Sequence, residues 1–238
     1  MITPSPLSAP LQDQEGRYEL KFLSPVDSYD WVIGKIKRHP GLFHAPYPAR
    51  SVNNIYFDTE NLDAYADNLS GISRRVKVRY RWYGDDDKAD KGTLEVKLRR
   101  NQTGWKLQYK MPGIQISHGL VWNNVLSDLK KELPPEGIVW LDAYTRPILI
   151  NRYRRKYFVS ADRAFRITVD ENVRTYNQWI SRRVDLNRPA EKMQDSIIVE
   201  VKFAQEHRKR APEILDALSI RRSRHSKYMT GAEACFTF

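Results

Sequence analysis

Three segments of this sequence carry a glutamate and a lysine two positions apart. The pairs are Glu19/Lys21, Glu95/Lys97 and Glu200/Lys202. In an extended strand, residues two positions apart project from the same face, so each pair places a carboxylate beside an ammonium group. Neighbouring segments contribute the arginines Arg79, Arg81, Arg155 and Arg166. Guanidinium and ammonium groups bind phosphate oxygens and carboxylates bind divalent cations, so the set is typical of phosphate chemistry.

The segment from Val76 to Gly84, VKVRYRWYG, predicts how these residues are positioned. Its side chains alternate with a period of two, which indicates a β-strand. Valine, tyrosine and tryptophan occupy one face, and Lys77, Arg79 and Arg81 occupy the other. Similar alternation predicts strands at 17–24, 51–59, 93–100, 105–110, 149–160, 165–170 and 196–203.

Helical spacing of apolar residues predicts helices at about 26–38, 62–69, 120–133 and 212–218. We expect Pro134 and Pro135 to stop the third helix. Residues 1–16 are rich in Pro, Ser and Gln and lack periodicity, which predicts a disordered tail. Residues 17–238 are expected to form one domain. The polar stretch 171–195 gives no pattern from which to predict an element.

The charged faces of the strands allow two arrangements. In one, they are the wetted face of an open antiparallel sheet, where cross-strand ion pairs contribute a few tenths of a kcal/mol each. In the other, helices cover the apolar faces from outside and the charges point inward. That arrangement is an α+β fold with a closed antiparallel barrel, a polar, cation-rich lumen and helices packed outside. We favour it because the charged residues alternate with aliphatic ones in strand after strand, and it implies a polyanionic ligand.

The carboxylates have two possible roles. The residues concerned are Glu19, Glu95, Asp170 and Glu200. They could hold Mg²⁺ or Mn²⁺ beside bound phosphates through oxygen ligands. Alternatively, each glutamate pairs with its neighbouring lysine. We expect the metal at Glu200, and both roles stay open for Glu19 and Glu95.

The overall composition agrees with a polyanionic partner and excludes several classes of protein. Among 238 residues, 40 Lys and Arg against 29 Asp and Glu give a net charge of +11. Cys235 is the single cysteine, which excludes a disulfide framework and fits a reducing, cytoplasmic location. We expect no membrane span and no signal peptide. The sequence has no Ser-His-Asp spacing, GxxxxGK loop or HExxH helix, and its five histidines are scattered.

Taken together, the motifs resemble those of the vacuolar transporter chaperone (VTC) domain. They are RWYG at 81–84 with Arg79 before it, YxR at 153–155, RITVD at 166–170, EVK at 200–202 and SKY at 226–228. VTC domains are polyphosphate polymerases of the triphosphate tunnel, or CYTH-like, superfamily. The resemblance extends from about Arg17 to the C-terminus, in the family's order.

The resemblance implies a tunnel that binds ATP and inorganic polyphosphate, and an ATP:polyphosphate phosphotransferase that uses Mn²⁺ or Mg²⁺. The matching residues assigned to catalysis are Arg79, Arg81, Arg155, Arg166 and Lys227. Those assigned to substrate binding are Lys21, Lys97, Tyr153, Lys202 and Ser226. Lys106 or Lys110 matches a further substrate-binding lysine. Glu200 matches the metal-binding carboxylate.

Two departures from the wider superfamily limit what the resemblance implies. The hydrolytic branch usually begins with Glu-x-Glu-x-Lys, whereas Arg17 occupies the first carboxylate position here. This favours binding of a chain over hydrolysis. Eukaryotic members carry membrane helices and a phosphate-sensing N-terminal domain; we expect neither here, so vacuolar translocation is not implied.

Three other functions remain open from the sequence. The first is a metal-dependent triphosphatase of the same fold, with water as the acceptor. The second is a non-catalytic module that binds polyphosphate or another polyanion. The third is RNA or DNA binding through the basic and aromatic strands, and nucleic acid is the least expected of these partners.

Overall fold

The computed structural model describes residues 17–85, 87, 90–100, 103–190, 196–223 and 225–236. The predicted tail, residues 1–16, lies outside the described residues. The strands are β1 Arg17–Pro25, β2 Arg50–Asp58, β3 Arg74–Tyr83, β4 Lys91–Arg100, β5 Thr103–Pro112, β6 Arg146–Val159, β7 Phe165–Asn177, β8 Ser196–Ala204 and β9 Arg222–Ser223. The helices are η2 Val26–Ser28, α1 Tyr29–Lys37, α2 Asp63–Leu69, α3 Trp122–Lys131, α4 Pro135–Ala143, η4 Gln205–His207, α5 Ala211–Leu218 and α6 Lys227–Phe236.

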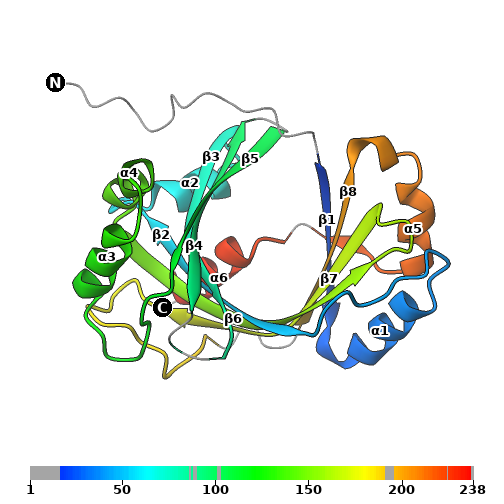
Figure 1. Cartoon of the computed structure of the whole chain (residues 1–238), viewed down its shortest axis with the longest axis horizontal. Helices are drawn as coiled ribbons and strands as arrows, with labels where there is room; N and C mark the ends of the chain where they lie inside the picture. Colours follow the sequence, from blue (N-terminus) through cyan, green and yellow to red (C-terminus); the bar gives the residue numbers. More distant parts are fainter. Residues whose placement is uncertain are drawn as a thin grey trace.

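The strands form one antiparallel sheet in the order β5-β4-β3-β2-β6-β7-β8-β1-β9. Figure 1 shows the sheet curling until β1 and β8 lie across from β3 and β4. The prediction of a closed barrel is wrong, because β5 and β9 are the two edges of the sheet. The short β9 pairs with β1 at Lys21 and Phe22, and thereby occupies the edge that closure would require.

Helices cover the outer, apolar face of the curved sheet from two sides, as predicted (Figure 1). On one side, α3 and α4 pack on β3 and β4, where Val78, Tyr80 and Leu94 are completely buried. On the other side, α1 and α5 pack on β7 and β8 over Ile167 and Val199. Because successive side chains of a strand alternate between faces, this burial leaves the charged positions on the inner face.

The predicted strands and helices are present, some with different ends, but α4 and β9 were not predicted. Strand β7 continues to Asn177, into the stretch where no element was predicted. Pro135, which was expected to stop the preceding helix, is also the first residue of α4. Helix α6 was not predicted. Within the described residues, no helix has the length and apolar character needed to cross a membrane.

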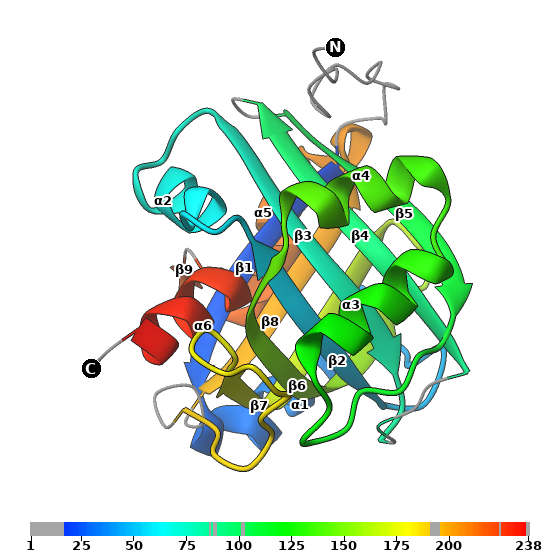
Figure 2. The same ribbon diagram turned by 90° about the vertical axis from the view of Figure 1, so that its left-hand side faces the viewer.

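Helix α6 lies across one end of the curved sheet, beside β9 (Figures 1 and 2). The buried carboxylate of Asp58, the last residue of β2, connects it to the sheet. Asp58 Oδ2 accepts a hydrogen bond of 2.6 Å from the hydroxyl of Tyr228, in the first turn of α6. Both carboxylate oxygens also accept backbone N–H groups from the start of α2, at Ala64 and Tyr65. Asp58 therefore fixes α2 and α6 relative to β2.

Removing the hydroxyl of Tyr228 tests this connection. We expect Tyr228→Phe to lower the free energy of unfolding by about 2 kcal/mol, because a buried carboxylate loses a donor. The midpoint of urea denaturation measures the change. Tyr83→Phe removes the hydroxyl of a half-exposed tyrosine and should change stability by less than about 0.5 kcal/mol. Equal stability of the two variants would contradict the role of Asp58.

Candidate functional site

The charged inner face encloses a pocket of about 110 Å³. We call it the inner pocket. The side chains lining it, among the described residues, are Glu19, Lys21, Tyr56, Lys77, Arg79, Arg81, Lys97, Tyr153, Arg155, Glu200, Lys202, Ser226, Lys227 and Tyr228. Eight of these are Lys or Arg and two are glutamate. Cations therefore outnumber carboxylates in a confined volume, which is the electrostatic character of a site for a polyanion.

One wall of the inner pocket is built by β3 and β4. Glu95 is almost fully buried there, and Arg79 on the adjacent strand donates from Nε to its Oε2 at 2.6 Å. Lys106 and Gln108 on β5 donate to Oε1 at 3.1 and 2.9 Å. Burial opposes ionisation, but Arg79, Arg81 and Lys106 hold the pKa of Glu95 well below its usual value. Glu95 thus pairs with Arg79 and Lys106, and not with Lys97 as one of the two sequence interpretations had it.

The opposite wall comes from β6, β7, β8 and α6. Asp170 is completely buried and accepts two hydrogen bonds from Arg155, at 2.5 and 2.7 Å. Lys227, the first residue of α6, places its Nζ 2.5 Å from Asp170 and 3.3 Å from Glu200. Burial opposes the charge of Asp170, but Lys227 and Arg155 lower the pKa of its carboxyl. The cations of this wall are therefore held in place by two carboxylates.

Strand β1, paired with β8, completes the opposite wall. Lys21 contacts Glu19 at 3.1 Å, and Lys202 contacts Glu19 at 3.3 Å and Glu200 at 3.4 Å. The predicted pairing of Glu19 with its neighbouring lysine is therefore present. Burial and Glu200 oppose ionisation of Glu19, yet Lys97, Lys202 and Lys21 together lower its pKa to about 2.

Two lysines have excess positive charge around them and, among the described residues, no balancing carboxylate in hydrogen-bond contact. Lys77 and Lys97 lie directly opposite each other on β3 and β4, and Lys97 also lies opposite Lys106. Like charges in such positions repel. Burial, together with Lys21 and other cations, lowers the pKa of Lys77 to about 7, and burial together with Arg79 lowers that of Lys97 to about 7. A bound polyanion would restore the charge of both.

Neutral donors complete the inner pocket. Ser226 accepts a hydrogen bond of 3.0 Å from Lys77, and the hydroxyl of Tyr56 accepts one of 3.1 Å from Arg79. Arg81 donates to the hydroxyl of Tyr153 at 3.3 Å. Burial alone would raise the pKa of Tyr153, but the nearby Arg155 and Arg81 lower it. These hydroxyls lie beside ammonium and guanidinium groups, where they can donate to phosphate oxygens.

Ten of the thirteen predicted site residues line the inner pocket, and three do not. Arg166 is exposed and lies opposite Lys202, toward the end of the inner face. Lys106 lies behind Glu95, and Lys110 is exposed opposite Thr93. Their assigned roles stay predictions.

Sequence reasoning did not assign Lys77, Tyr56 and Tyr228 to the site, although all three line it. Lys77 carried a usable signal, since it shares the period-two face of Arg79 and Arg81. Tyr56 stands between Ile55 and Phe57 in an apolar run, which gives no indication of an inward hydroxyl.

The positions of the four inner carboxylates, Glu19, Glu95, Asp170 and Glu200, indicate which of them could hold the expected metal ion. All four of these carboxylates contact two or more cations, and Glu19 and Glu200 are the two that line the inner pocket. No group of three or more His, Cys, Asp or Glu placed to hold a metal occurs within the described part of the chain. Mg²⁺ is usually held by one or two carboxylates together with substrate phosphates and water. Glu200 with Glu19 beside it fits that type of site.

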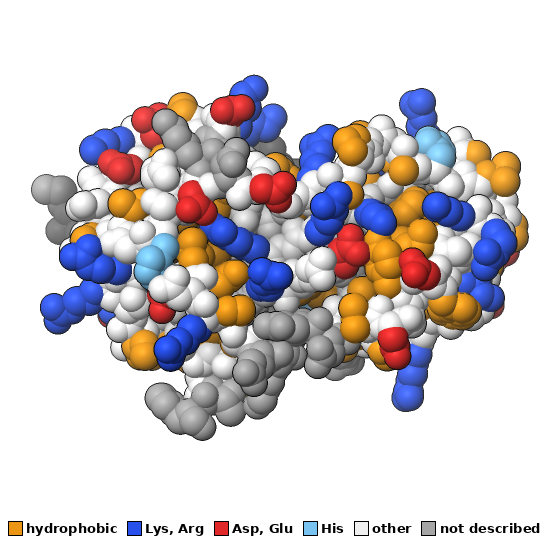
Figure 3. All heavy atoms as spheres, turned by 90° about the horizontal axis from the view of Figure 1, so that it is seen from below, with side chains coloured by type: hydrophobic (Ala, Val, Ile, Leu, Met, Phe, Trp, Pro, Cys, Tyr) orange, Lys and Arg blue, Asp and Glu red, His pale blue; other side chains and the backbone are white. Residues whose placement is uncertain are grey.

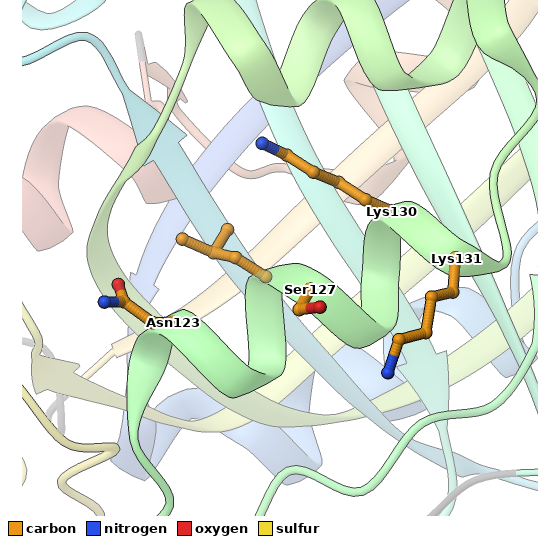
Figure 4. Close-up of a pocket in the computed structure, with 5 residues that line it drawn as sticks. Asn123, Ser127, Lys130 and Lys131 are labelled. Carbon is orange, nitrogen blue, oxygen red and sulfur yellow. The ribbon is translucent and has the colours of Figure 1, made fainter.

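The outer surface offers a different kind of hollow. A depression of about 580 Å³ on α3 is lined by Asn123, Leu126, Ser127, Lys130 and Lys131 (Figure 4). Its two lysines pair with Asp142 and Asp128. Figure 3 shows another outer face, on which basic side chains are interspersed with acidic and apolar ones. Neither surface has the concentrated positive charge of the inner pocket.

A family model described as the VTC domain matches residues 16–236. The chain belongs to the VTC domain family. The match spans the whole curved sheet and α1–α6, and it confirms the resemblance that the motifs predicted. None of the curated proteins compared matches the chain.

Several solved structures resemble this VTC domain, including the following two. One is a putative adenylate cyclase from Vibrio parahaemolyticus, 13% identical, with a TM-score of 0.52 over 92% of this chain and 99% of that one. The other is the PH1819 protein from Pyrococcus horikoshii OT3, 13% identical, with a TM-score of 0.48 over 91% and 99%. The first similarity shows a common fold and no more.

The lowered lysine pKa values give the VTC domain a pH dependence that can be tested. A bound anion stabilises the charged form of Lys97. Without ligand the pKa of Lys97 is about 7, so above pH 7 the lysine must take up a proton when the anion binds. The affinity that Lys97 contributes should therefore be present below pH 7 and lost as pH rises. We expect the ratio of the tripolyphosphate Kd of Lys97→Met to that of the wild type to fall about tenfold between pH 6.5 and 8.5.

Isothermal titration calorimetry measures this ratio, and the ratio cancels the titration of the ligand itself. Lys131→Met, which removes an exposed lysine from α3, provides the control and should give a ratio near one at every pH. A Lys97→Met ratio that does not change with pH would contradict the lowered pKa.

Proposed function

We propose that this VTC domain is a polyphosphate polymerase that transfers the γ-phosphate of ATP to a growing polyphosphate chain in the cytoplasm. The observation that carries the proposal is the imbalance of charge around the inner pocket, where the eight lining cations outnumber the lining Glu19 and Glu200 and the buried Glu95 and Asp170 behind them. A chain of phosphates, with a negative charge on every unit, supplies the missing countercharge. Membership of the VTC family supports polyphosphate as that chain.

Transfer of a phosphoryl group requires positioning and neutralisation of charge more than a protein nucleophile. In the proposal, Arg81, Arg155 and Lys227 bind the triphosphate, and Lys21 and Lys97 bind the acceptor chain. An oxygen of the terminal acceptor phosphate forms a bond to the γ-phosphorus. The bond from that phosphorus to the β–γ bridging oxygen breaks, and ADP leaves with the electron pair. The guanidinium groups stabilise the charge that develops on the transferred oxygens.

Glu200, with Glu19 beside it, is the proposed ligand of Mn²⁺ or Mg²⁺. The ion would neutralise phosphate oxygens when bound. In the ligand-free arrangement, Lys227, Lys202 and Lys21 contact Glu200 at 3.3, 3.4 and 3.9 Å. These lysines are the groups that must turn from the carboxylate to phosphate for substrate and ion to bind together.

The carboxylate pairing favours transfer over hydrolysis. Glu95 and Asp170 neutralise Arg79, Arg155 and Lys227. Glu19 and Glu200 also contact lysines, but they are the two carboxylates that line the inner pocket and are therefore the ones within reach of a metal bound there. A triphosphatase that activates water would draw on more carboxylates than these two.

Incubation with ATP and Mn²⁺, followed by gel electrophoresis of the products, tests the proposal. Long phosphate chains are expected from the wild type. Free phosphate without chains would indicate the triphosphatase, and binding of polyphosphate without turnover would indicate the non-catalytic module. Nucleic-acid binding that polyphosphate does not compete away would favour the RNA- or DNA-binding function.

Arg81→Met should lower the rate of chain formation by about 10²–10³-fold, since a donor to the transferred phosphate is lost. Glu200→Gln should also lose chain formation while it retains affinity for tripolyphosphate measured without metal. Lys131→Met is the matched control and should form chains at the wild-type rate. Wild-type turnover in Arg81→Met, with its folding verified by circular dichroism, would contradict the proposed role of the inner pocket.

A further inference from the structure

Tyr47, Arg50 and Tyr157 contact one another beyond the inner pocket, and Tyr83 lies near them on β3, opposite Val52 and so two residues along β2 from Arg50. We call these four residues the tyrosine–arginine cluster. The guanidinium of Arg50 lies 4.9 Å from the ring centroid of Tyr47 and 5.9 Å from that of Tyr157. The rings of Tyr47 and Tyr157 meet edge to face, with centroids 5.2 Å apart and planes at 72°. These contacts hold flat groups in defined orientations.

The strands place the cluster next to the phosphate-binding cations. Tyr157 follows Arg155 by two residues on β6, and Tyr83 follows Arg81 by two residues on β3. Arg50 lies directly opposite Arg155. Two residues along a strand share a face and are about 7 Å apart. The cluster is therefore one step along the inner face from the inner pocket.

The cluster lies at the end of the inner face that is remote from α6. Lys77, near the start of β3, contacts Ser226 just before α6, and Tyr83 is the last residue of the same strand. At this end, Tyr47 and Tyr83 are 47% and 46% exposed. A ligand whose phosphates occupy the inner pocket can therefore leave its remaining part against these side chains.

The cluster contributes little to the packing of the fold. None of its four residues belongs to a buried hydrophobic core of the described chain. Exposed tyrosine rings and an arginine plane are instead the surfaces on which nucleobases stack, because every base has a flat aromatic face. Inorganic phosphate chains have no such face, so the cluster would distinguish a nucleotide from a bare polyphosphate.

We propose that Tyr47, Arg50, Tyr83 and Tyr157 form a nucleobase-stacking site at the mouth of the inner pocket. This inference rests on the proposed function, in which the phosphate donor is a nucleoside triphosphate. It assigns the direction in which the donor binds. The triphosphate enters between Arg81 and Arg155, and the base stays at the end remote from α6.

Comparison of ATP with inorganic tripolyphosphate tests the inference, because the two share the phosphate chain and differ in the nucleoside. For Tyr83→Ala we expect the Kd for ATP to rise about tenfold and the Kd for tripolyphosphate to change less than twofold. In the chain-forming assay, the KM for ATP should rise with little change in kcat. Tyr83→Phe, which keeps the ring, should retain wild-type affinity for ATP.

Trp31→Ala is a matched control. Trp31 on α1 is 46% exposed and also lies beside a cation, Lys35, at 5.3 Å, but it is on the outer surface. Its loss should alter binding of neither ligand. Equal weakening of ATP and tripolyphosphate in Tyr83→Ala, or no weakening of ATP, would overturn the stacking site and leave the proposed function standing. A wild-type protein that binds neither ligand would overturn both.

Discussion

Repulsion among cations on a confined inner face is the constraint on which this structure depends. Side chains that repel one another can lie together only if carboxylates or a ligand balance them. Asp170 performs this role between Arg155 and Lys227, and Glu95 performs it between Arg79 and Lys106. The balance is incomplete at Lys77 and Lys97, which lie opposite each other and whose pKa values are lowered by burial and by neighbouring cations. The fold thus holds a charge distribution that is completed by binding.

The outer parts of the molecule can be understood as the support of that face. Apolar side chains must be buried on the other side of each strand, and α1, α3, α4 and α5 bury them. Helix α6 has a different task, because its first residue, Lys227, points into the inner pocket while Tyr228 is tied to Asp58. The same turn of helix therefore delivers a cation and anchors it. The anchored helix therefore holds Lys227 in one position, although a lysine side chain is flexible by itself.

Much of this design could be predicted from the sequence because a strand has a period of two. The alternation in β3 and β8 is enough to assign Arg79, Arg81 and Glu200 to the charged faces of their strands. Closure of the sheet could not be predicted in the same way. Closure depends on which strand pairs with the free edge of β1. That strand is β9, and two residues are too few to show a periodic pattern.

The partners in the ion pairs could not be predicted from the sequence either. Glu95 lies two positions from Lys97 but across from Arg79, and only the pairing of β3 with β4 decides between them. Arg155 reaches Asp170 in a register that shifts between Arg152 and Arg154 on β6, and local alternation does not reveal such a bulge. The consequence concerns function as well as fold. Glu95 and Asp170 act as counterions behind the lining of the inner pocket, whereas Glu200 lines the pocket, is contacted at 3.3 Å or more, and can exchange its cations for a metal while they turn to phosphate.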